Sequence, residues 1–196
     1  PWVLGRDGND TMDVKKQIEE ADLSAFEAIL SVSPYYNRPN QEGLYQHYKV
    51  LAGTGKKIII YNVPSRTGQN LEASTTLRLA NEFPNLIMIK EAAPNILQYF
   101  DILRQKPAHF SLVSGDDEYT LPVTLAGGDG VISVIGQGYP KEFSTMVQLA
   151  FEGKVKEAYE IHNKLVEITR LTFAEGNPAG IKTVLAELGI VKNFVR

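Results

Sequence analysis

The sequence predicts an α/β fold, namely a (β/α)8 TIM barrel with additional helices at its C-terminal end. Short apolar runs recur as far as residue 135, roughly 20–30 residues apart, and amphipathic helical patterns lie between them. Polar residues follow the carboxyl ends of several of these runs. Strands that are apolar throughout are typical of a parallel sheet with helices outside it, so we expect repeated strand–helix units.

We expect six strands, at residues 2–5, 28–32, 57–62, 86–90, 110–114 and 130–135. The helices expected between them cover residues 11–21, 41–51, 71–83, 96–105 and 117–126. Asn9, Asp10 and Thr11 are the candidate caps at the start of the first helix, the second helix follows Asn40 and the third follows Asn70. All of these residue types cap helix N-termini, so their positions support the expected starts.

After residue 135 the pattern changes from alternating elements to helices alone. The expected helices cover residues 140–152, 155–173 and 179–188, and glycine or proline residues separate them. We therefore expect two domains, a partial barrel over residues 1–152 and a C-terminal helical region over residues 153–196.

An open doubly wound sheet is the alternative to a barrel, and nucleotide-binding motifs would favour it. Only Gly5 and Gly8 resemble such a motif, and no Walker sequence is present. In a barrel, the carboxyl ends of the strands converge on the face where catalysis takes place. The polar strand ends favour the barrel, and they are Ser33, Tyr61-Asn62, Lys90-Glu91, Ser114 to Asp117 and Ser133.

The composition excludes several classes of function. The 196 residues carry a formal net charge of −3, which gives no reason to expect nucleic acid or a membrane as partner. No cysteine is present, which excludes disulfides and zinc–thiolate sites and fits the cytoplasm. The histidines, His47, His109 and His162, lack metal-ligand spacing, so we expect no metal and read them as surface or helix-face residues. No signal peptide or membrane-spanning run is visible.

Lys90 follows the apolar run Leu86-Ile87-Met88-Ile89 without an intervening turn, so its amine is expected at the end of a buried strand. Burial disfavours the ammonium form and lowers the pKa of a lysine from about 10.4. The neutral amine is a nucleophile that forms a Schiff base with a carbonyl compound. The alternative is a strand-end lysine whose long side chain reaches water.

Other candidate residues lie at neighbouring strand ends. Tyr61 ends the strand at 57–62, where it serves either as a proton donor and acceptor or as a core residue. Arg66 lies in the following turn, where its guanidinium suits a substrate carboxylate or an ordinary salt bridge. Tyr35 and Tyr36 are adjacent in a proline-bounded loop, so one can face the site and the other an interface. Gly115 permits a close approach of a ligand to the backbone.

The acidic residues after Gly115 are expected to have a structural role. Asp116 and Asp117 lie at the start of the helix expected at residues 117–126, and we expect one or the other to cap its N-terminus.

Taken together, these motifs resemble the dihydrodipicolinate synthase family of class I pyruvate aldolases, which also includes N-acetylneuraminate lyase. Five motifs occur in the family's order, and they are Pro34 to Pro39, Tyr61 to Gly68, Ile89 to Ala92, Ser114 to Asp117 and Gly130 to Val134. The resemblance extends from about Pro1 to Arg196. It implies strands three to eight of the barrel, a homodimer or homotetramer, and condensation of pyruvate with aspartate 4-semialdehyde for lysine and diaminopimelate biosynthesis.

The resemblance also implies roles for individual residues, with no cofactor other than the covalent Schiff base. Lys90 would bind pyruvate, Tyr61 would relay protons, and Tyr36 would reach into a neighbouring subunit's site. Arg66 would bind the semialdehyde carboxylate. Gly115 and Ile132 would line the pyruvate pocket.

A lysine-binding regulatory site is implied at Asn9, Asp13 and Tyr35. The family residue at the Asp13 position is often glutamate in lysine-sensitive members, so this sequence departs from the lysine-sensitive pattern there.

The sequence departs from the family pattern in two further respects. The family has two strands before the segment that matches Pro1, and the second ends in a Thr-Thr-Gly-Glu motif that does not occur here. We therefore expect the 196 residues to be a partial record of a longer enzyme. The segment from Gly5 to Gly8 also places Arg6 and Asp7 where the family tends to have small residues.

Two alternative functions remain open. One is a sibling aldolase or dehydratase that acts on another 2-oxo acid, which Arg66 disfavours. The other is an inactive truncated barrel that serves only as a binding or subunit-interaction module.

Overall fold

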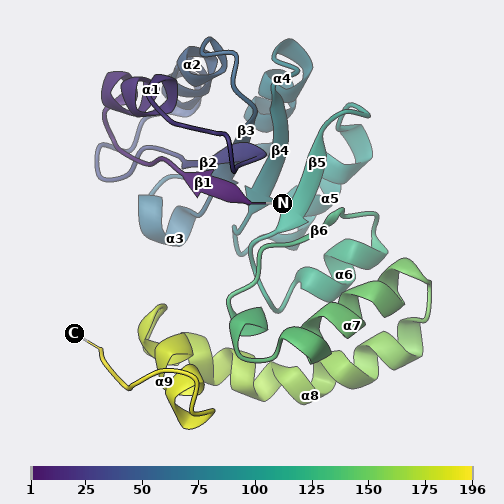
Figure 1. Cartoon of the computed structure of the whole chain (residues 1–196). Coiled ribbons are helices and arrows are strands. Elements are labelled where there is room, and N and C mark those ends of the chain that lie inside the picture. Colours follow the sequence, from purple (N-terminus) through teal and green to yellow (C-terminus); the bar gives the residue numbers. More distant parts are fainter. Residues whose placement is uncertain (1, 196) are drawn as a thin grey trace. The chain divides into compact units, whose positions relative to one another are not determined.

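The computed structural model describes residues 2–195, and the chain divides into two compact units, Pro1–Gly115 and Asp116–Arg196. The first unit alternates strands and helices, whereas the second is almost entirely helical (Figure 1). The boundary expected near residue 153 lies inside the second unit, where Gly153 forms the turn between two helices with a φ of 72°.

The first unit contains the parallel sheet that the apolar runs predict. Its strands pair in chain order, each with the next, and they are β1 (Val3–Gly5), β2 (Ala28–Val32), β3 (Ile58–Asn62), β4 (Leu86–Glu91) and β5 (Ser111–Ser114). Each strand lies within two residues of its expected position. The β-branched run Ile58-Ile59-Ile60 is buried, as expected for a central strand with helices beside it.

Helices separate the strands, and they are α1 (Thr11–Glu19), α2 (Gln41–Ala52), α3 (Pro64–Thr67), α4 (Ala73–Glu82) and α5 (Ile96–Gln105). The caps predicted for α1 and α2 are confirmed, because Asp10 accepts hydrogen bonds from the backbone of Met12 and Asp13, and Asn40 accepts one from Gly43. The cap predicted at Asn70 is wrong, since Glu72 precedes α4. The Asn70 side chain instead binds Asn62 and Gln98.

The helices cover the sheet with the faces that the apolar pattern predicts. Buried residues include Val14 and Ile18 from α1, Leu44, Tyr48 and Leu51 from α2, Leu79 from α4, and Tyr99 and Ile102 from α5. His47, which the sequence suggests is a surface or helix-face residue, is only 3% exposed. Its Nδ1 lies 2.8 Å from the Thr11 hydroxyl, so the ring fastens α2 to the start of α1.

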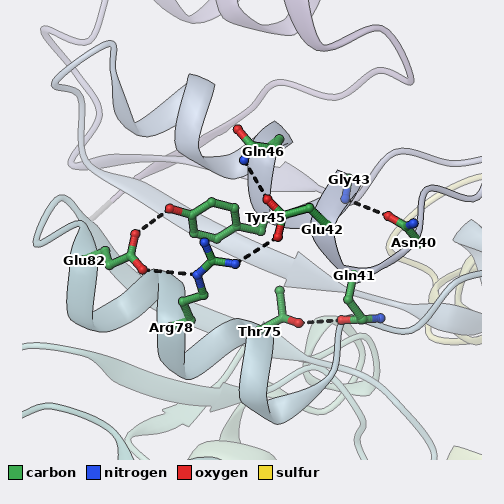
Figure 2. Close-up of polar contacts among 9 residues, drawn as sticks. All are labelled: Asn40, Gln41, Glu42, Gly43, Tyr45, Gln46, Thr75, Arg78 and Glu82. Carbon is green, nitrogen blue, oxygen red and sulfur yellow. Dashed lines mark hydrogen bonds and ion pairs between the residues drawn. The ribbon is translucent and has the colours of Figure 1, made fainter.

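A polar clamp joins α2 and α4 on their outer side (Figure 2). The Arg78 guanidinium lies 3.4 Å from the centroid of the Tyr45 ring and forms ion pairs with Glu42 and Glu82. The Tyr45 hydroxyl donates a hydrogen bond to Glu82. These contacts fix the packing of two helices that are each preceded by a segment from the carboxyl end of a strand, β2 for α2 and β3 for α4.

The second unit contains α6 (Thr120–Leu125), the short strand β6 (Gly130–Val131), a 3₁₀ turn (Ile135–Gln137), α7 (Pro140–Phe151), α8 (Val155–Ala174) and α9 (Ala179–Glu187). Helices α7 and α8 lie side by side and share a core that includes Phe143, Met146 and Leu165 (Figure 1). The three C-terminal helices lie within one residue of their expected positions.

The strand predicted at residues 130–135 is too long, because it ends at Val131. The Asp117 carboxylate accepts hydrogen bonds from the backbone N–H groups of Val134 and Ile135, which turns the chain away from an extended conformation. Asp117 therefore does not cap a helix. Asp116 caps the turn that precedes α6 rather than the helix itself, because its carboxylate accepts hydrogen bonds from the N–H groups of Glu118 and Tyr119, and no side chain of the described residues 2–195 caps α6.

Within residues 2–195, no helix has both the length and the apolar character that are needed to cross a bilayer.

Candidate active site

The register of β3 against β4 decides which side chains meet at the carboxyl ends of these strands. Ile58 lies opposite Leu86, but Ile59 lies opposite Met88, so β4 accommodates one additional residue. Because of this irregularity, Tyr61 lies opposite Lys90 and Asn62 lies opposite Glu91. Paired residues share a face of a sheet and successive residues alternate, so the two pairs lie on opposite faces.

Lys90 and Tyr61 form the first pair; the sequence predicts that they lie on neighbouring strands, and the register brings them opposite each other. The Lys90 Nζ lies 4.2 Å from the centroid of the Tyr61 ring, and both residues are half-buried. Burial raises the pKa of the Tyr61 hydroxyl, the positive charge of Arg66 lowers it, and the negative charge of Asp7 raises it again. Tyr61 is thus a neutral phenol that is placed to exchange protons beside the amine.

Gly115 provides the space that the Lys90 side chain occupies. A Cβ atom at this position would lie 2.9 Å from the Lys90 Cε and 2.9 Å from the Ala92 Cβ. The Gly115 N–H also donates a hydrogen bond to the Glu91 carbonyl, at 2.6 Å. A larger residue would therefore displace the amine or the strand end, which gives Gly115 a clear reason to be glycine.

A cavity of about 250 Å³ opens beside Tyr61. Its lining residues come from the ends of three neighbouring strands and the loops that follow them, and they are Asp7, Val32, Tyr35, Tyr61, Val63, Arg66 and Thr67. Tyr61 and Arg66 thus meet in one cavity, as the sequence predicts. The sequence indicates Asp7 only as a departure from the family pattern, but its carboxylate lies in the cavity and accepts a hydrogen bond from the Val32 N–H at 2.8 Å.

The two adjacent tyrosines face different surroundings. Tyr35 lines the cavity, whereas the Tyr36 side chain is 88% exposed. The backbone of Tyr36 has a φ of 72°, a value that residues other than glycine rarely adopt. Such strain persists at sites where the surrounding structure requires it, and it often marks function. Within residues 2–195, the exposed ring of Tyr36 is available for a contact outside the chain.

An indirect contact connects Asn9 of the expected lysine site to the loop that carries Tyr35. The Asn37 side chain, which follows the two tyrosines, donates a hydrogen bond to the Asn9 carbonyl at 3.0 Å. Asn9 and Asp13 are exposed at the start of α1, and neither lines the cavity that Tyr35 lines. Ile132 belongs to the second unit, where it follows β6 directly and is half-buried.

Asn62 and Glu91 form the second pair; the sequence places them among the polar strand ends but does not predict that they meet. Glu91 has no exposed surface, and its carboxylate accepts hydrogen bonds from the side-chain amides of Asn62 and Gln98 and from the Ala93 N–H. Burial raises the pKa of Glu91 to about 7, although these hydrogen bonds oppose the shift. Successive side chains of a strand alternate between the two faces of the sheet, so Glu91 points away from the face that Lys90 occupies. This alternation is the only feature of the sequence that indicates a separate environment for Glu91.

Among residues 2–195, no three His, Asp or Glu side chains lie close enough together to hold a metal ion.

Comparison with known proteins gives a consistent set of relatives. A family model described as the dihydrodipicolinate synthetase family matches residues 3–196. Two curated 4-hydroxy-tetrahydrodipicolinate synthases, from Flavobacterium psychrophilum and Parabacteroides distasonis, are 53% and 50% identical to the chain over 197 residues. These matches cover 100% of this chain and 67% and 66% of the relatives, so the chain spans about two thirds of their length.

Solved structures agree with this result. Dihydrodipicolinate synthase from Thermotoga maritima has a TM-score of 0.95 at 37% identity, over 100% of this chain and 68% of that chain. The chloride-inhibited dihydrodipicolinate synthase from Acinetobacter baumannii, solved in complex with pyruvate, has a TM-score of 0.94 at 36% identity. That match covers 100% of this chain and 67% of the other.

Proposed function

Because the chain belongs to the dihydrodipicolinate synthetase family, we propose that the protein is a 4-hydroxy-tetrahydrodipicolinate synthase. It condenses pyruvate with aspartate 4-semialdehyde, on the route to diaminopimelate and lysine. The observation that carries this proposal is the placement of Tyr61 between Lys90, which it faces across the strand pair, and Arg66, with which it shares a cavity.

The chemistry begins at Lys90. Its neutral amine adds to the carbonyl carbon of pyruvate, and loss of water leaves an imine. The protonated imine withdraws electrons, so the methyl group loses a proton and becomes an enamine. The enamine carbon then bonds to the aldehyde carbon of the semialdehyde, whose oxygen takes up a proton. Finally, the amino group of the second substrate attacks the imine carbon, which closes the ring and releases the Lys90 amine.

The surrounding residues serve these steps in three ways. Tyr61, a half-buried phenol with a raised pKa, donates and accepts the protons that imine formation and ring closure require. Arg66, which lines the same cavity, binds the carboxylate of the semialdehyde. Gly115 leaves room for the Lys90 side chain and for pyruvate bound to it. No metal or organic cofactor takes part in this sequence of steps.

We propose a larger assembly around this site. The parallel strand order and the solved relatives support a (β/α)8 barrel, with residues 1–152 in the barrel part and residues 153–196 in the helical region. The exposed, strained Tyr36 supports a homo-oligomer in which this side chain completes the proton relay of a neighbouring subunit. Ile132 lines the pyruvate pocket, and the enzyme acts in the cytoplasm.

A regulatory lysine site at Asn9, Asp13 and Tyr35 is a separate proposal. The hydrogen bond from Asn37 to the Asn9 carbonyl supports it, because it joins the loop of Tyr35 to the start of α1. A lysine-bound relative from Cyanidioschyzon merolae has a TM-score of 0.91 at 33% identity, over 96% of this chain and 64% of that chain. Adding lysine to the assay, with the wild type and with Asn9→Ala, tests this proposal, since only the wild type should be inhibited.

Borohydride trapping tests the proposed function. Incubation of the full-length protein with pyruvate and borohydride should reduce the imine and add a three-carbon group to Lys90, which peptide mass spectrometry locates. Lys90→Arg should abolish labelling and turnover, whereas Lys49→Arg, on an outer helix, should preserve both. Labelling at another lysine, or efficient turnover by Lys90→Arg, would contradict the assignment.

A further inference from the structure

Glu91 is a buried carboxylate that the steps above do not use. Its oxygens lie 2.9 and 3.1 Å from the Asn62 Nδ2, 2.8 Å from the Gln98 Nε2 and 2.7 Å from the Ala93 N. All three groups are donors, so the carboxylate acts as an acceptor toward each of them. The geometry of this site favours the ionised carboxylate. Burial nevertheless disfavours the charge and raises the pKa of Glu91 to about 7.

The two amides that bind Glu91 also bind the end of the loop that carries Arg66. The Asn62 Oδ1 accepts a hydrogen bond from the Leu71 N–H at 3.0 Å, and the Gln98 Nε2 donates one to the Leu71 carbonyl at 3.2 Å. Asn70 lies between them, with its side chain 2.9 Å from the Asn62 Nδ2 and 2.8 Å from the Gln98 Oε1. The segment of residues 63–70 is therefore fixed at both ends beside Glu91.

Helix α2 supports the same loop end through a neutral side chain. The Gln41 Nε2 donates a hydrogen bond to the Asn70 carbonyl at 2.8 Å. The Gln41 Oε1 accepts hydrogen bonds from the Glu72 N–H and from the Thr75 hydroxyl, the latter drawn in Figure 2. The Gln41 contacts do not depend on ionisation, whereas those of Glu91 do.

We propose that Glu91 is a positioning residue: through Asn62 and Gln98, its carboxylate holds the segment of residues 63–70 so that Arg66 meets the carboxylate of the second substrate. This inference rests on the proposed function. Lys90 lies on the opposite face of β4, so the role of Glu91 concerns the semialdehyde rather than the attachment of pyruvate.

Protonation of Glu91 disturbs this arrangement. A protonated carboxyl group has to place a hydrogen among three donors, so at least one of the amides must turn away. The titratable groups that face Glu91 from the neighbouring helices already have partners. Tyr48 of α2 binds the Ser33 hydroxyl and the Ser31 carbonyl, and Tyr99 of α5 donates a hydrogen bond to the Glu91 carbonyl. The amides therefore respond to the charge of Glu91.

Steady-state kinetics of Glu91→Gln in the full-length protein test the proposal. Gln has the shape of the protonated acid, so we expect the KM for aspartate semialdehyde to rise roughly tenfold at pH 8, since small misplacements of binding groups have effects of this order or larger. The KM for pyruvate and the rate of borohydride trapping should stay the same. Glu20→Gln, at an exposed position after α1, is the matched control and should change neither KM.

A second variant, Gln98→Met, and a pH series of the wild type test the same proposal without relying on Glu91→Gln alone. Gln98→Met removes one amide and should raise the same KM, and the combination with Glu91→Gln should be less than additive because both act on one network. In the wild type, the KM for the semialdehyde should rise as the pH falls through about 7, whereas Glu91→Gln should lack this dependence. A wild type without synthase activity would overturn the proposed function, whereas an active wild type with unchanged variants would overturn only the role of Glu91.

Discussion

Lys90 and Glu91 are consecutive residues at the carboxyl end of β4. The Lys90 side chain faces Tyr61, whereas the Glu91 side chain is fully buried among amide groups. Lys90 supplies the reacting amine, and Glu91 lies on the other face of the sheet, where water does not reach it. Because strand residues alternate, one short segment serves both the chemistry and its support. Substitutions at the residues around Lys90 should therefore have separable effects.

Gly115→Ala should slow imine formation without unfolding the protein. The added Cβ would lie 2.9 Å from the Lys90 Cε, so the side chain has to move, at an overpacking cost of roughly 1–3 kcal/mol. We expect the rate of borohydride trapping with pyruvate to fall at least about tenfold. Gly5→Ala is the control, since its new Cβ would meet only the Asp7 Oδ2, at 3.9 Å. Equal trapping rates for both variants would show that Gly115 is not needed for space.

Asp7→Asn should have the opposite effect to Glu91→Gln. The Asp7 carboxylate shares the cavity with Arg66, so its negative charge opposes a substrate carboxylate. Asn retains an acceptor for the Val32 N–H, so the loop should keep its conformation. We expect the KM for the semialdehyde to fall roughly threefold, and less at high salt, because Asp7 is exposed and its charge is screened. If the KM for the semialdehyde were unchanged at low salt, the charge of Asp7 would have no effect on binding of the substrate carboxylate.

At the scale of elements, the sequence predicts the strands and most helices well, but it does not predict their register. Apolar runs and caps indicate where β2, β3 and α5 lie because these are local signals. The additional residue in β4, which aligns Lys90 with Tyr61 instead of Asn62, depends on packing between strands that are distant in sequence. For the same reason, the burial of Glu91 and the partners of Asn62 are visible only in the folded chain.

The clamp between α2 and α4 offers a test at this scale (Figure 2). Arg78→Met keeps the length of the side chain but removes the ion pairs with Glu42 and Glu82 and the charge above the Tyr45 ring. Exposed ion pairs contribute little, so we expect a small decrease in the urea midpoint that disappears at high salt. Tyr45→Leu removes the ring but leaves both carboxylates, so a double-mutant cycle with Arg78→Met measures the coupling between the ring and the arginine. Additive effects would mean that the ring contact contributes nothing.

At the scale of the whole molecule, the first unit contains two buried ionisable groups with opposite effects on stability. Burial lowers the pKa of His47 from 6.5 to about 4, and within residues 2–195 its Nε2 has no hydrogen-bond partner. Burial raises the pKa of Glu91 from 4.5 to about 7. As the pH falls from 7 to 4.5, the folded state takes up a proton at Glu91, which favours folding. Over much of the same range, the unfolded state takes up a proton at His47, which favours unfolding.

We therefore predict that these two contributions nearly cancel between pH 4.5 and 6.5, and that single substitutions separate them. In Glu91→Gln, the free energy of unfolding should fall relative to wild type on acidification, because the stabilising uptake is lost while His47 still opposes folding. In His47→Gln, it should rise relative to wild type over the same range. Each difference should approach about 3 kcal/mol, from about 1.4 kcal/mol per pKa unit. Urea unfolding at a series of pH values measures these differences, and variant curves parallel to the wild type would show that neither group is buried in the ionisation state assigned here.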